Sequence, residues 1–300
     1  MSGGRGVAER IGPVGVWTFA LDRHPVGRAR EAVAEIEELG YPVVWIPEGL
    51  GSKEVLSHAA LLLGATGRLV LATGIASIWA RDPVAMANGA RTLEDAFPGR
   101  FVLGMGVSHR TSVDRRGAAT YGRPFTRMSQ YLDAMDAARY PVPDGPPPPR
   151  VLAALGPRML RLAAERTAGA HPYFVPVEHT AAARETLGAE PLLAPEQAVV
   201  LETVPERARA IARAYMGHYL KLENYANNLL RLGWSEEDIR QATDSLVDAI
   251  VAWGDVEAIR ARVREHLDAG ADHVSVQVLE EDPAALPVDG LRELAPALLS

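Results

Sequence analysis

Short apolar runs alternate with amphipathic helices along most of the chain. After each run, apolar residues recur every three to four positions, as in Ala29, Val33, Ile36 and Leu39, which indicates a helix. The runs predict eight strands, at residues 14–19, 41–46, 69–77, 101–108, 150–155, 170–175, 196–201 and 271–279. Eight strands alternating with helices are typical of a (β/α)8 barrel, so we expect an α/β fold built as a TIM barrel.

Two features bear on the domain organisation. A doubly wound sheet would need five or six strands and a glycine-rich turn after the first strand, and the segment FALDRHP at 19–25 contains no glycine. A long helical stretch runs from about residue 206 to 253, with a break near Gly233, and precedes the last strand. We therefore predict a single barrel domain over residues 1–300 with a helical insertion at about 206–253.

Composition excludes several classes of function. The chain has no cysteine, which rules out disulfides, thiolate metal sites and cysteine nucleophiles. No histidine pair or carboxylate cluster has the spacing of metal ligands, and no G-x-S-x-G motif indicates a serine hydrolase. The net charge of −7 argues against a nucleic-acid partner. No apolar run reaches the roughly 18 residues that span a bilayer, so we expect a cytoplasmic protein without a membrane partner.

The strand predicted at 101–108, FVLGMGVS, ends in small residues. Side chains alternate along a strand, so Val102, Gly104, Gly106 and Ser108 share one face, and the bulkier residues between them share the other. The segments TGIAS at 73–77 and AALG at 153–156 become small in the same way. If the bulky faces pack outward, a shallow floor remains at the barrel mouth, on which a flat ring could lie. Relief of crowding in a barrel that binds nothing is the alternative.

Candidate chemistry falls at the predicted strand ends. Gly156, Pro157 and Arg158 open a helix, where free backbone N–H groups and a cation suit a phosphate; plain helix initiation is the alternative. Glu48 and His109 follow the second and fourth strands, where barrels place acids and bases. A structural hydrogen bond is the alternative for each of these two side chains.

The insertion concentrates aromatic and amide side chains in MGHYLKLENYANNLLRLGW at 216–234. This composition fits either a substrate pocket or a helical hairpin with an aromatic contact face. We expect Tyr225 of this segment to contact the substrate, together with Trp17 and Trp79.

Four segments carry a resemblance to a known family: LATGIASIWARDPVAMANGARTLEDAFPGRFVLGMGVSH at 71–109, RMSQYLDAM at 127–135, LAALGPRMLRLAAERTAGAHPYFVPVEH at 152–179 and HYLKLENYANNLLRLGW at 218–234. They resemble the luciferase-like superfamily of flavin- and deazaflavin-dependent oxidoreductases, most closely an actinobacterial branch of F420-dependent oxidoreductases. The resemblance implies hydride transfer between C5 of coenzyme F420 and a small organic substrate. An FMN-dependent monooxygenase and a non-catalytic deazaflavin-binding protein are the alternatives. Dimers are common in this superfamily, so a homodimer is among the expected assemblies.

The resemblance also implies residue roles. A non-proline cis peptide at Gly74–Ile75 would support the cofactor ring, and Ser77 would lie beside it. The remaining residues that it assigns to cofactor binding are Val107, Ser108, His109, Leu155, Gly156, Pro157, Arg158, His179 and Thr180.

One departure refines this expectation. Sugar-phosphate dehydrogenases of the family carry an Asp-His pair after the second strand, where this chain has Pro47, Glu48 and Gly49. That substrate class is therefore not expected, and the catalytic acid or base stays open between Glu48 and His109. Cationic side chains at the mouth, namely Arg110, Arg115, Arg116 and Arg158, would suit the oligoglutamate tail of F420 and favour F420 over FMN.

Overall fold

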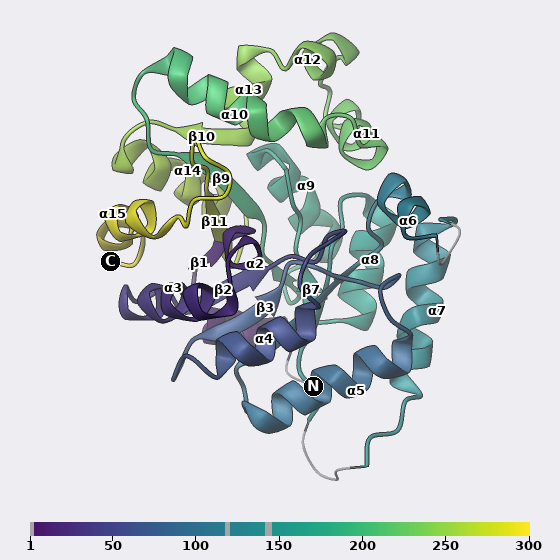
Figure 1. Ribbon diagram of the computed structural model, residues 1–300. Coiled ribbons are helices and arrows are strands. Elements are labelled where there is room, and N and C mark those ends of the chain that lie inside the picture. The colour runs from purple at the N-terminus through teal and green to yellow at the C-terminus, as the bar shows by residue number, and fades with distance from the viewer. Residues whose placement is uncertain (1–2, 118–120, 142–145) are drawn as a thin grey trace.

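A ring of parallel strands forms the centre of the computed structural model, which describes residues 3–117, 121–141 and 146–300, without the side chain of Arg116 (Figure 1). Along the ring lie β1 (Val14–Trp17), β2 (Val43–Ile46), β3 (Val70–Thr73), β5 (Phe101–Gly106), β6 (Arg150–Leu152), β7 (Gly169–Ala170), β8 (Leu192–Leu193), β9 (Glu196–Val200) and β11 (Val274–Val278). The two-residue strand β4 (Ala76–Ser77) continues β3 after a break and pairs with β5. All of these pairings are parallel.

The ring closes through the extended segment 192–200. Its first part, β8, pairs with β7, and its second part, β9, pairs with β11. At the junction, the Ala194 N–H donates to the Ala170 carbonyl (2.9 Å), and on the other side the Ser275 N–H donates to the Pro195 carbonyl (3.0 Å). The segment 192–200 thus connects β7 to β11 and closes the ring. The predicted TIM barrel is confirmed.

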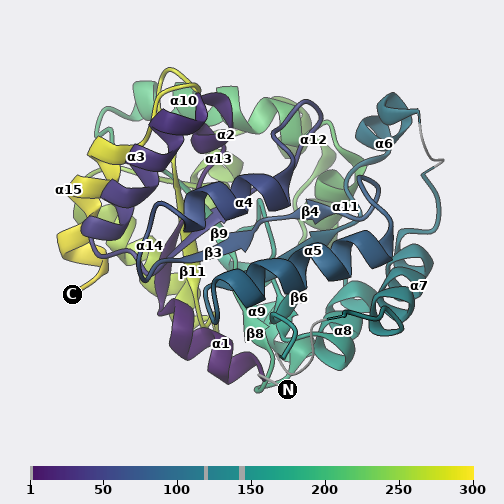
Figure 2. The same ribbon diagram turned by 60° about the horizontal axis from the view of Figure 1, so that its bottom comes forward.

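Helices cover the outside of the ring. They are α3 (Val26–Glu38), α4 (Val55–Leu63), α5 (Pro83–Ala96), α7 (Pro124–Asp136), α8 (Pro157–Arg166), α9 (Val177–Leu187), α14 (Val256–Asp268) and α15 (Val288–Leu298). Two short helices, α2 (Ala20–Arg23) and α6 (Arg110–Arg116), lie at the C-terminal ends of the strands instead, where residues of both line the cavity described below. The helix α1 (Gly4–Ile11) instead lies at the N-terminal end of the barrel (Figure 2), where its buried Val7 and Ile11 pack against residues of the barrel interior. Sequence analysis did not predict α1. Among the described residues, no helix is long and apolar enough to cross a membrane.

Four helices form a layer at the top of Figure 1: α10 (Pro205–Tyr219), α11 (Glu223–Arg231), α12 (Glu236–Gln241) and α13 (Asp244–Ile250). They share an apolar core that includes Phe174, Met216, Leu229 and Leu246. The helical stretch predicted to reach residue 253 ends at Ile250, because the next residues form strand β10 (Val251–Trp253), which pairs with β9. Valine and tryptophan favour the pleated, paired backbone of a strand.

The two faces of β5 differ as the alternation predicts. Phe101, Leu103 and Met105 pack in the core between the strands and the outer helices. Val102 packs on the opposite face, in the barrel interior with Val151. The glycines of β5 therefore lie on the inner face, towards the cavity described next.

Candidate functional site

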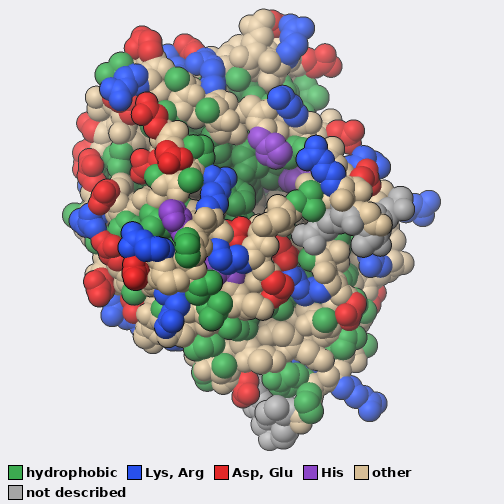
Figure 3. Space-filling view, in the orientation of Figure 1, with side chains coloured by type: hydrophobic (Ala, Val, Ile, Leu, Met, Phe, Trp, Pro, Cys, Tyr) green, Lys and Arg blue, Asp and Glu red, His purple; other side chains and the backbone are tan. Residues whose placement is uncertain are grey.

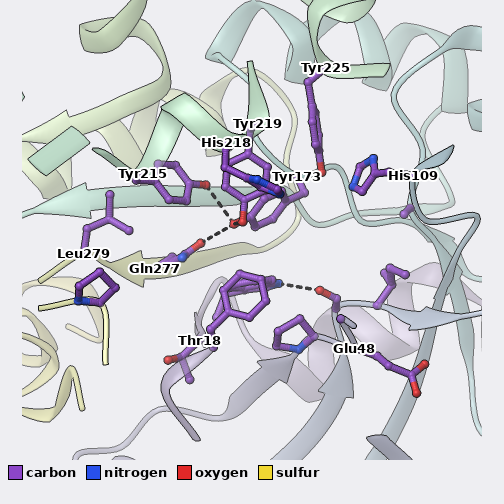
Figure 4. A pocket seen from close by; sticks show the side chains of 18 of the residues that line it. Thr18, Glu48, His109, Tyr173, Tyr215, His218, Tyr219, Tyr225, Gln277 and Leu279 are labelled. Atoms are coloured by element: carbon purple, nitrogen blue, oxygen red, sulfur yellow. Dashed lines mark hydrogen bonds between the residues drawn. The ribbon is translucent and has the colours of Figure 1, made fainter. Parts of the chain in front are cut away.

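A cavity of about 1120 Å³ opens at the C-terminal ends of the barrel strands, beneath α10 and α11 (Figures 3 and 4). Its volume leaves room for an extended ligand, since typical small-molecule pockets span roughly 300–1,000 Å³. The predicted site residues that line it are Trp17, Glu48, Gly74, Ile75, Val107, Ser108, His109, Leu155, Gly156 and Tyr225. The predicted residues Ser77, Trp79, Pro157, Arg158, His179 and Thr180 lie outside its wall.

The floor of the cavity is built by the chain between β3 and β4. The peptide bond between Gly74 and Ile75 is cis, as the resemblance implied. A Cβ on Gly104 would lie 1.9 Å from the Thr73 carbonyl oxygen, and one on Gly106 would lie 2.6 Å from Cδ1 of Ile75. The small inner face of β5 therefore makes room for this segment. The shallow-floor interpretation placed the ligand on the small residues of the strand itself. In the structure, a ligand in the cavity would contact Gly74 and Ile75 instead.

Trp17 supports the floor from the neighbouring strand β1. Its indole N–H donates to the Gly74 carbonyl oxygen (3.2 Å), and its ring is almost fully buried. A Cβ on Gly74 would lie 2.6 Å from that indole nitrogen, so the close approach requires glycine at this position.

Both carboxylate oxygens of Glu48 are engaged. Arg81 donates to each of them, and the Ser77 backbone N–H donates to Oε2 (2.8 Å). Burial opposes the charge of Arg81, but the hydrogen bond and charge of Glu48, with the charge of Glu54, hold the Arg81 pKa above its ordinary value. Figure 4 shows the Glu48 carboxylate turned away from the tyrosines of the cavity. These contacts suit a residue that supports the cavity floor better than a group that exchanges protons.

His109 occupies the cavity wall at the end of β5. Its Nδ1 lies 2.9 Å from the Asn224 amide oxygen on α11, and its ring packs 5.3 Å from the ring of Tyr225. Since that oxygen only accepts, Nδ1 carries the proton and Nε2 presents a lone pair. Burial lowers the His109 pKa; the Asn224 hydrogen bond opposes this shift, and the nearby His218 adds to it. Ser108, just before it, has a left-handed backbone (φ 54°) that turns the chain at the barrel rim.

The start of α8 faces the cavity, but its cation differs from the predicted one. Arg158 is exposed and lies over the ring of Phe125, 4.5 Å from its centroid. Arg231 on α11 reaches the helix start instead: its Nη2 lies 3.6 Å from the position of a Cβ on Gly156 and donates to the Asn228 amide oxygen (2.7 Å). Arg231 belongs to the segment 218–234, whose aromatic and amide side chains, but not its arginine, were predicted to take part in the site.

Two residues predicted to bind the cofactor are committed to the protein itself. Thr180 is fully buried, and its hydroxyl lies 2.8 Å from Nδ1 of His266. His179 is also buried and bonds through Nε2 to the Leu155 carbonyl (2.9 Å), while burial lowers its pKa to about 4. His179 therefore supports the end of β6, and Thr180 is too far inside the fold to contact a ligand.

Two further predicted site residues, at the edge between β3 and β5, also make their contacts within the protein. The Trp79 indole N–H donates to the Val107 carbonyl (2.7 Å), and its ring lies under the guanidinium of Arg127 (5.3 Å). Ser77 is buried, with its backbone N–H donated to Glu48. Neither residue lines the cavity, and both support its wall through these contacts.

A cluster of tyrosines on the opposite wall was not predicted. The Tyr173 hydroxyl lies 3.0 Å from that of Tyr215, 3.0 Å from that of Tyr219 and 2.9 Å from Oε1 of Gln277 (Figure 4). Beneath it, Glu196 is 1% exposed; Oε2 accepts the Phe174 N–H (3.2 Å), and Oε1 has no hydrogen-bond partner within the described ranges. Burial raises the Glu196 pKa to about 8, and the Phe174 N–H only partly opposes this.

Comparison with known proteins identifies the family. The family model described as luciferase-like monooxygenase matches residues 12–273. The chain belongs to this luciferase-like family. Its match to a putative coenzyme F420-dependent oxidoreductase of Mycobacterium tuberculosis is 33% identical over 103 residues, 34% of this chain and 29% of the relative. The chain spans about a third of the length of the curated relatives that it matches first.

Solved structures share the fold of this luciferase-like chain. An F420-dependent secondary alcohol dehydrogenase in complex with an F420-acetone adduct has a TM-score of 0.77 at 15% identity, over 95% of this chain and 98% of that one. The oxygenating constituent of 3,6-diketocamphane monooxygenase of Pseudomonas putida, in complex with FMN, has a TM-score of 0.68 at 14% identity, over 95% and 98%. At this identity both comparisons establish the fold alone.

Proposed function

We propose that this luciferase-like protein is an F420-dependent oxidoreductase acting on a small organic substrate. The observation that carries the proposal is that one cavity joins the Gly74–Ile75 floor, His109 and Gly156 at the start of α8. Arg231 does not line this cavity, but its Nη2 lies 3.6 Å from the position of a Cβ on Gly156. When bound, F420 would supply or accept a hydride at C5 of its deazaflavin ring. The protein would orient and desolvate the two reactants.

The residues present fit such a cofactor. Gly74 and Ile75 offer a flat, apolar support for a ring, and the backbone at Val107–His109 borders it. At the start of α8 the Arg231 guanidinium lies close to Gly156, next to the positive end of the helix dipole, which is the chemistry that a phosphate requires. Asn228, beside Arg231, is 1% exposed, and its Nδ2 has no hydrogen-bond partner in the part of the chain that the structure describes.

The charges at the mouth favour F420 over FMN. Arg115 lines the cavity, and Arg110 lies 5.3 Å over the ring of Tyr121, which also lines it. With Arg158 they make one side of the mouth cationic, as a polyanionic tail requires; the Arg116 side chain lies outside the described residues. An FMN-dependent monooxygenase is the second candidate, since FMN has the same ring-to-phosphate layout and a neighbour of the same fold binds it.

His109 is the group that we propose moves the proton accompanying hydride transfer. Its Nε2 faces no hydrogen-bond partner among the described residues, and burial keeps the ring neutral near pH 7. A neutral imidazole held by Asn224 can take a proton at Nε2 and return it, which suits either direction of the reaction.

Fluorescence titration with F420 and, separately, FMN tests the proposal. Binding of F420 at micromolar or lower concentration, with weaker binding of FMN, would support it and justify a screen of carbonyl and unsaturated acceptors with reduced F420. Preference for FMN would move the protein to the monooxygenase candidate, to be followed by oxygen consumption. Binding of neither would refute both candidates.

Replacing Arg231 by alanine is expected to weaken F420 binding about tenfold or more, because the cofactor phosphate loses a charge-assisted hydrogen bond. Binding of the phosphate-free deazaflavin core should change little. Arg161→Ala is the matched control, since Arg161 is an exposed arginine of α8 that does not line the cavity. Titrations of both ligands check this result; equal losses for the two ligands, or a larger loss in the Arg161 variant, would contradict the phosphate assignment.

Replacing Asn224 by aspartate is expected to raise the His109 pKa by about one unit, since a carboxylate beside Nδ1 stabilises the charged ring. An NMR titration of the His109 ring protons measures the shift directly, and the pH profile of turnover should move upward with it. Asn227→Asp, on the exposed face of the same helix, is the control. If the pH profile of turnover does not shift in Asn224→Asp, or if the same profile is still seen in His109→Gln, then His109 is not the group that transfers the proton.

Glu48→Gln is expected to cost roughly 2 kcal/mol of folding stability, because it leaves the partly buried Arg81 without its main counter-charge. When turnover is expressed per folded molecule, the Glu48→Gln variant should lose far less of it than the His109→Gln variant, for which we expect a loss of roughly hundredfold or more. Urea unfolding and steady-state kinetics of the two variants provide the comparison. Equal kinetic losses at unchanged stability would return Glu48 to the catalytic role first considered for it.

A further inference from the structure

The wall opposite His109 holds a hydrogen-bonded group that the proposed function does not yet use. We call Tyr173, Tyr215, Tyr219 and Gln277 the tyrosine cluster. They come from the segment after β7, from α10 and from β11, and all four line the cavity (Figure 4). Each is partly or fully buried, so what they offer a ligand depends on which of their protons and lone pairs remain free.

The hydroxyl protons of the cluster can be assigned to its hydrogen bonds in one way when Gln277 presents its amide oxygen to Tyr173. Tyr173 has a single proton and two neighbouring oxygens, on Gln277 (2.9 Å) and Tyr219 (3.0 Å). The amide oxygen cannot donate, so the Tyr173 proton goes to it, and the Tyr219 proton is left to point back at Tyr173. Tyr215 also donates to Tyr173 (3.0 Å). Tyr173 is thereby saturated, with one bond donated and two accepted.

What remains for a ligand is a defined set of groups. The hydroxyl oxygens of Tyr215 and Tyr219 keep lone pairs but have used their protons. The amide nitrogen of Gln277 keeps two protons, with no hydrogen-bond partner among the described residues. A single ligand hydroxyl matches this set, because it donates its proton to a tyrosine oxygen and accepts from the amide. A carbonyl or ether oxygen would satisfy only the amide.

The charges around the cluster exclude a strongly anionic partner. Arg23 and Arg207 also line the cavity, but both are exposed and already engaged: Arg23 donates to the Pro283 carbonyl, and Arg207 pairs with Glu202 (3.2 Å). Glu196 lies buried near the tyrosines, where its charge, when formed, would repel an anion. The adjoining walls are aromatic, with Trp17 packing 4.7 Å from Tyr173.

We propose that the tyrosine cluster is a specificity site that binds a hydroxyl group of a neutral, ring-containing substrate. This inference rests on the proposed function, which places the same substrate in this cavity. It narrows the substrate class to uncharged hydroxylated cyclic compounds carrying the reducible or oxidisable carbon elsewhere in the cavity.

Matched ring probes test the inference: tetralone, hydroxytetralone, methoxytetralone and carboxytetralone. Their dissociation constants are measured by NMR, with and without saturating F420. Hydroxytetralone is expected to bind about tenfold more tightly than tetralone and methoxytetralone, since only it makes both hydrogen bonds. Carboxytetralone is expected to bind weakest.

Tyrosine-to-phenylalanine variants assign the effect to the cluster. The double variant Tyr215→Phe and Tyr219→Phe should reduce the preference for hydroxytetralone over methoxytetralone to about onefold while binding tetralone as before; circular dichroism checks its fold. Tyr140→Phe removes a hydroxyl outside the cavity and should keep the full preference. A preference that survives in the double variant, tightest binding by carboxytetralone, or no binding of any probe at millimolar concentration would overturn the inference.

The two proposals fail separately in this experiment. If F420 does not bind but the hydroxyl preference is present, the proposed function is wrong and the specificity site stands. If F420 binds and no probe prefers the cluster, only the specificity site is wrong.

Discussion

Acidification from pH 7 to about pH 4.5 is expected to unfold the protein, because its folded state excludes protons from five buried histidines. Burial lowers the pKa to about 4 for His58, His171, His179 and His273 and to about 3 for His266. All five side chains are at most 3% exposed. In the unfolded chain the same rings take up protons near pH 6.5.

The sign and size of the effect follow from linkage. Each histidine contributes its full stability above pH 6.5, and the contribution is lost as pH falls from 6.5 towards 4, roughly 3 kcal/mol per group. Glu196 acts in the opposite direction: its pKa is raised to about 8, so it adds stability as pH falls from 8 to about 4.5. One group cannot offset five: the net loss by pH 4.5 is about 10 kcal/mol, comparable to the 5–15 kcal/mol that typically holds a domain folded.

Urea unfolding at half-unit steps between pH 7.5 and 4.5 measures this dependence. His58→Leu is the informative variant, because Nε2 of His58 has no hydrogen-bond partner among the described residues and leucine removes the titration without breaking a bond. The free energy of unfolding of this variant should fall less steeply as the pH is lowered, because unfolding takes up about one proton fewer than in the parent protein. His218→Gln, at an exposed position, should follow the parent protein. A flat stability profile between pH 6.5 and 4.5 would show that the histidines take up protons while folded.

The barrel could be predicted because each strand and helix carries its own periodic signal. The elements that were missed are short or depend on distant partners. The strand at Val251–Trp253 exists because it pairs with β9, across the four helices between them. The helix at Gly4–Ile11 is held by packing against the barrel interior, which a local pattern does not reveal.

The site divides in the same way. Backbone features at strand ends, such as the cis bond at Gly74–Ile75 and the start of α8, could be located from sequence and resemblance. Tyr225 on α11 could be located as well, from the aromatic and amide side chains of its segment. Arg231 and Asn224 on the same helix could not, because only the fold brings Arg231 to Gly156 and Asn224 to His109. Long-range pairing also explains the change of role for Glu48: its partner Arg81 is 33 residues away.

The glycine at position 104 links the barrel to the floor of the cavity, and its replacement by alanine is expected to cost at least about 3 kcal/mol of folding stability. The new Cβ would lie 1.9 Å from the Thr73 carbonyl oxygen and 3.1 Å from the carbonyl carbon. These are backbone atoms in a buried strand, so the clash cannot be relieved by rotating a side chain. The segment from Thr73 to Ile75 has to move, and the cavity floor moves with it.

Two glycine variants separate this clash from the general cost of adding a methyl group. Gly217→Ala, inside α10 with no atom within 4 Å of the new Cβ, should be neutral or slightly stabilising. Gly106→Ala should be intermediate, because its Cβ meets the Ile75 side chain at 2.6 Å, which can partly give way. Because Ile75 forms part of the cavity floor, Gly106→Ala should lower the affinity for F420 more than it lowers the free energy of unfolding. Urea unfolding and F420 titration of the three variants measure both effects, and a Gly104→Ala protein as stable as Gly217→Ala would contradict the close packing on which the floor depends.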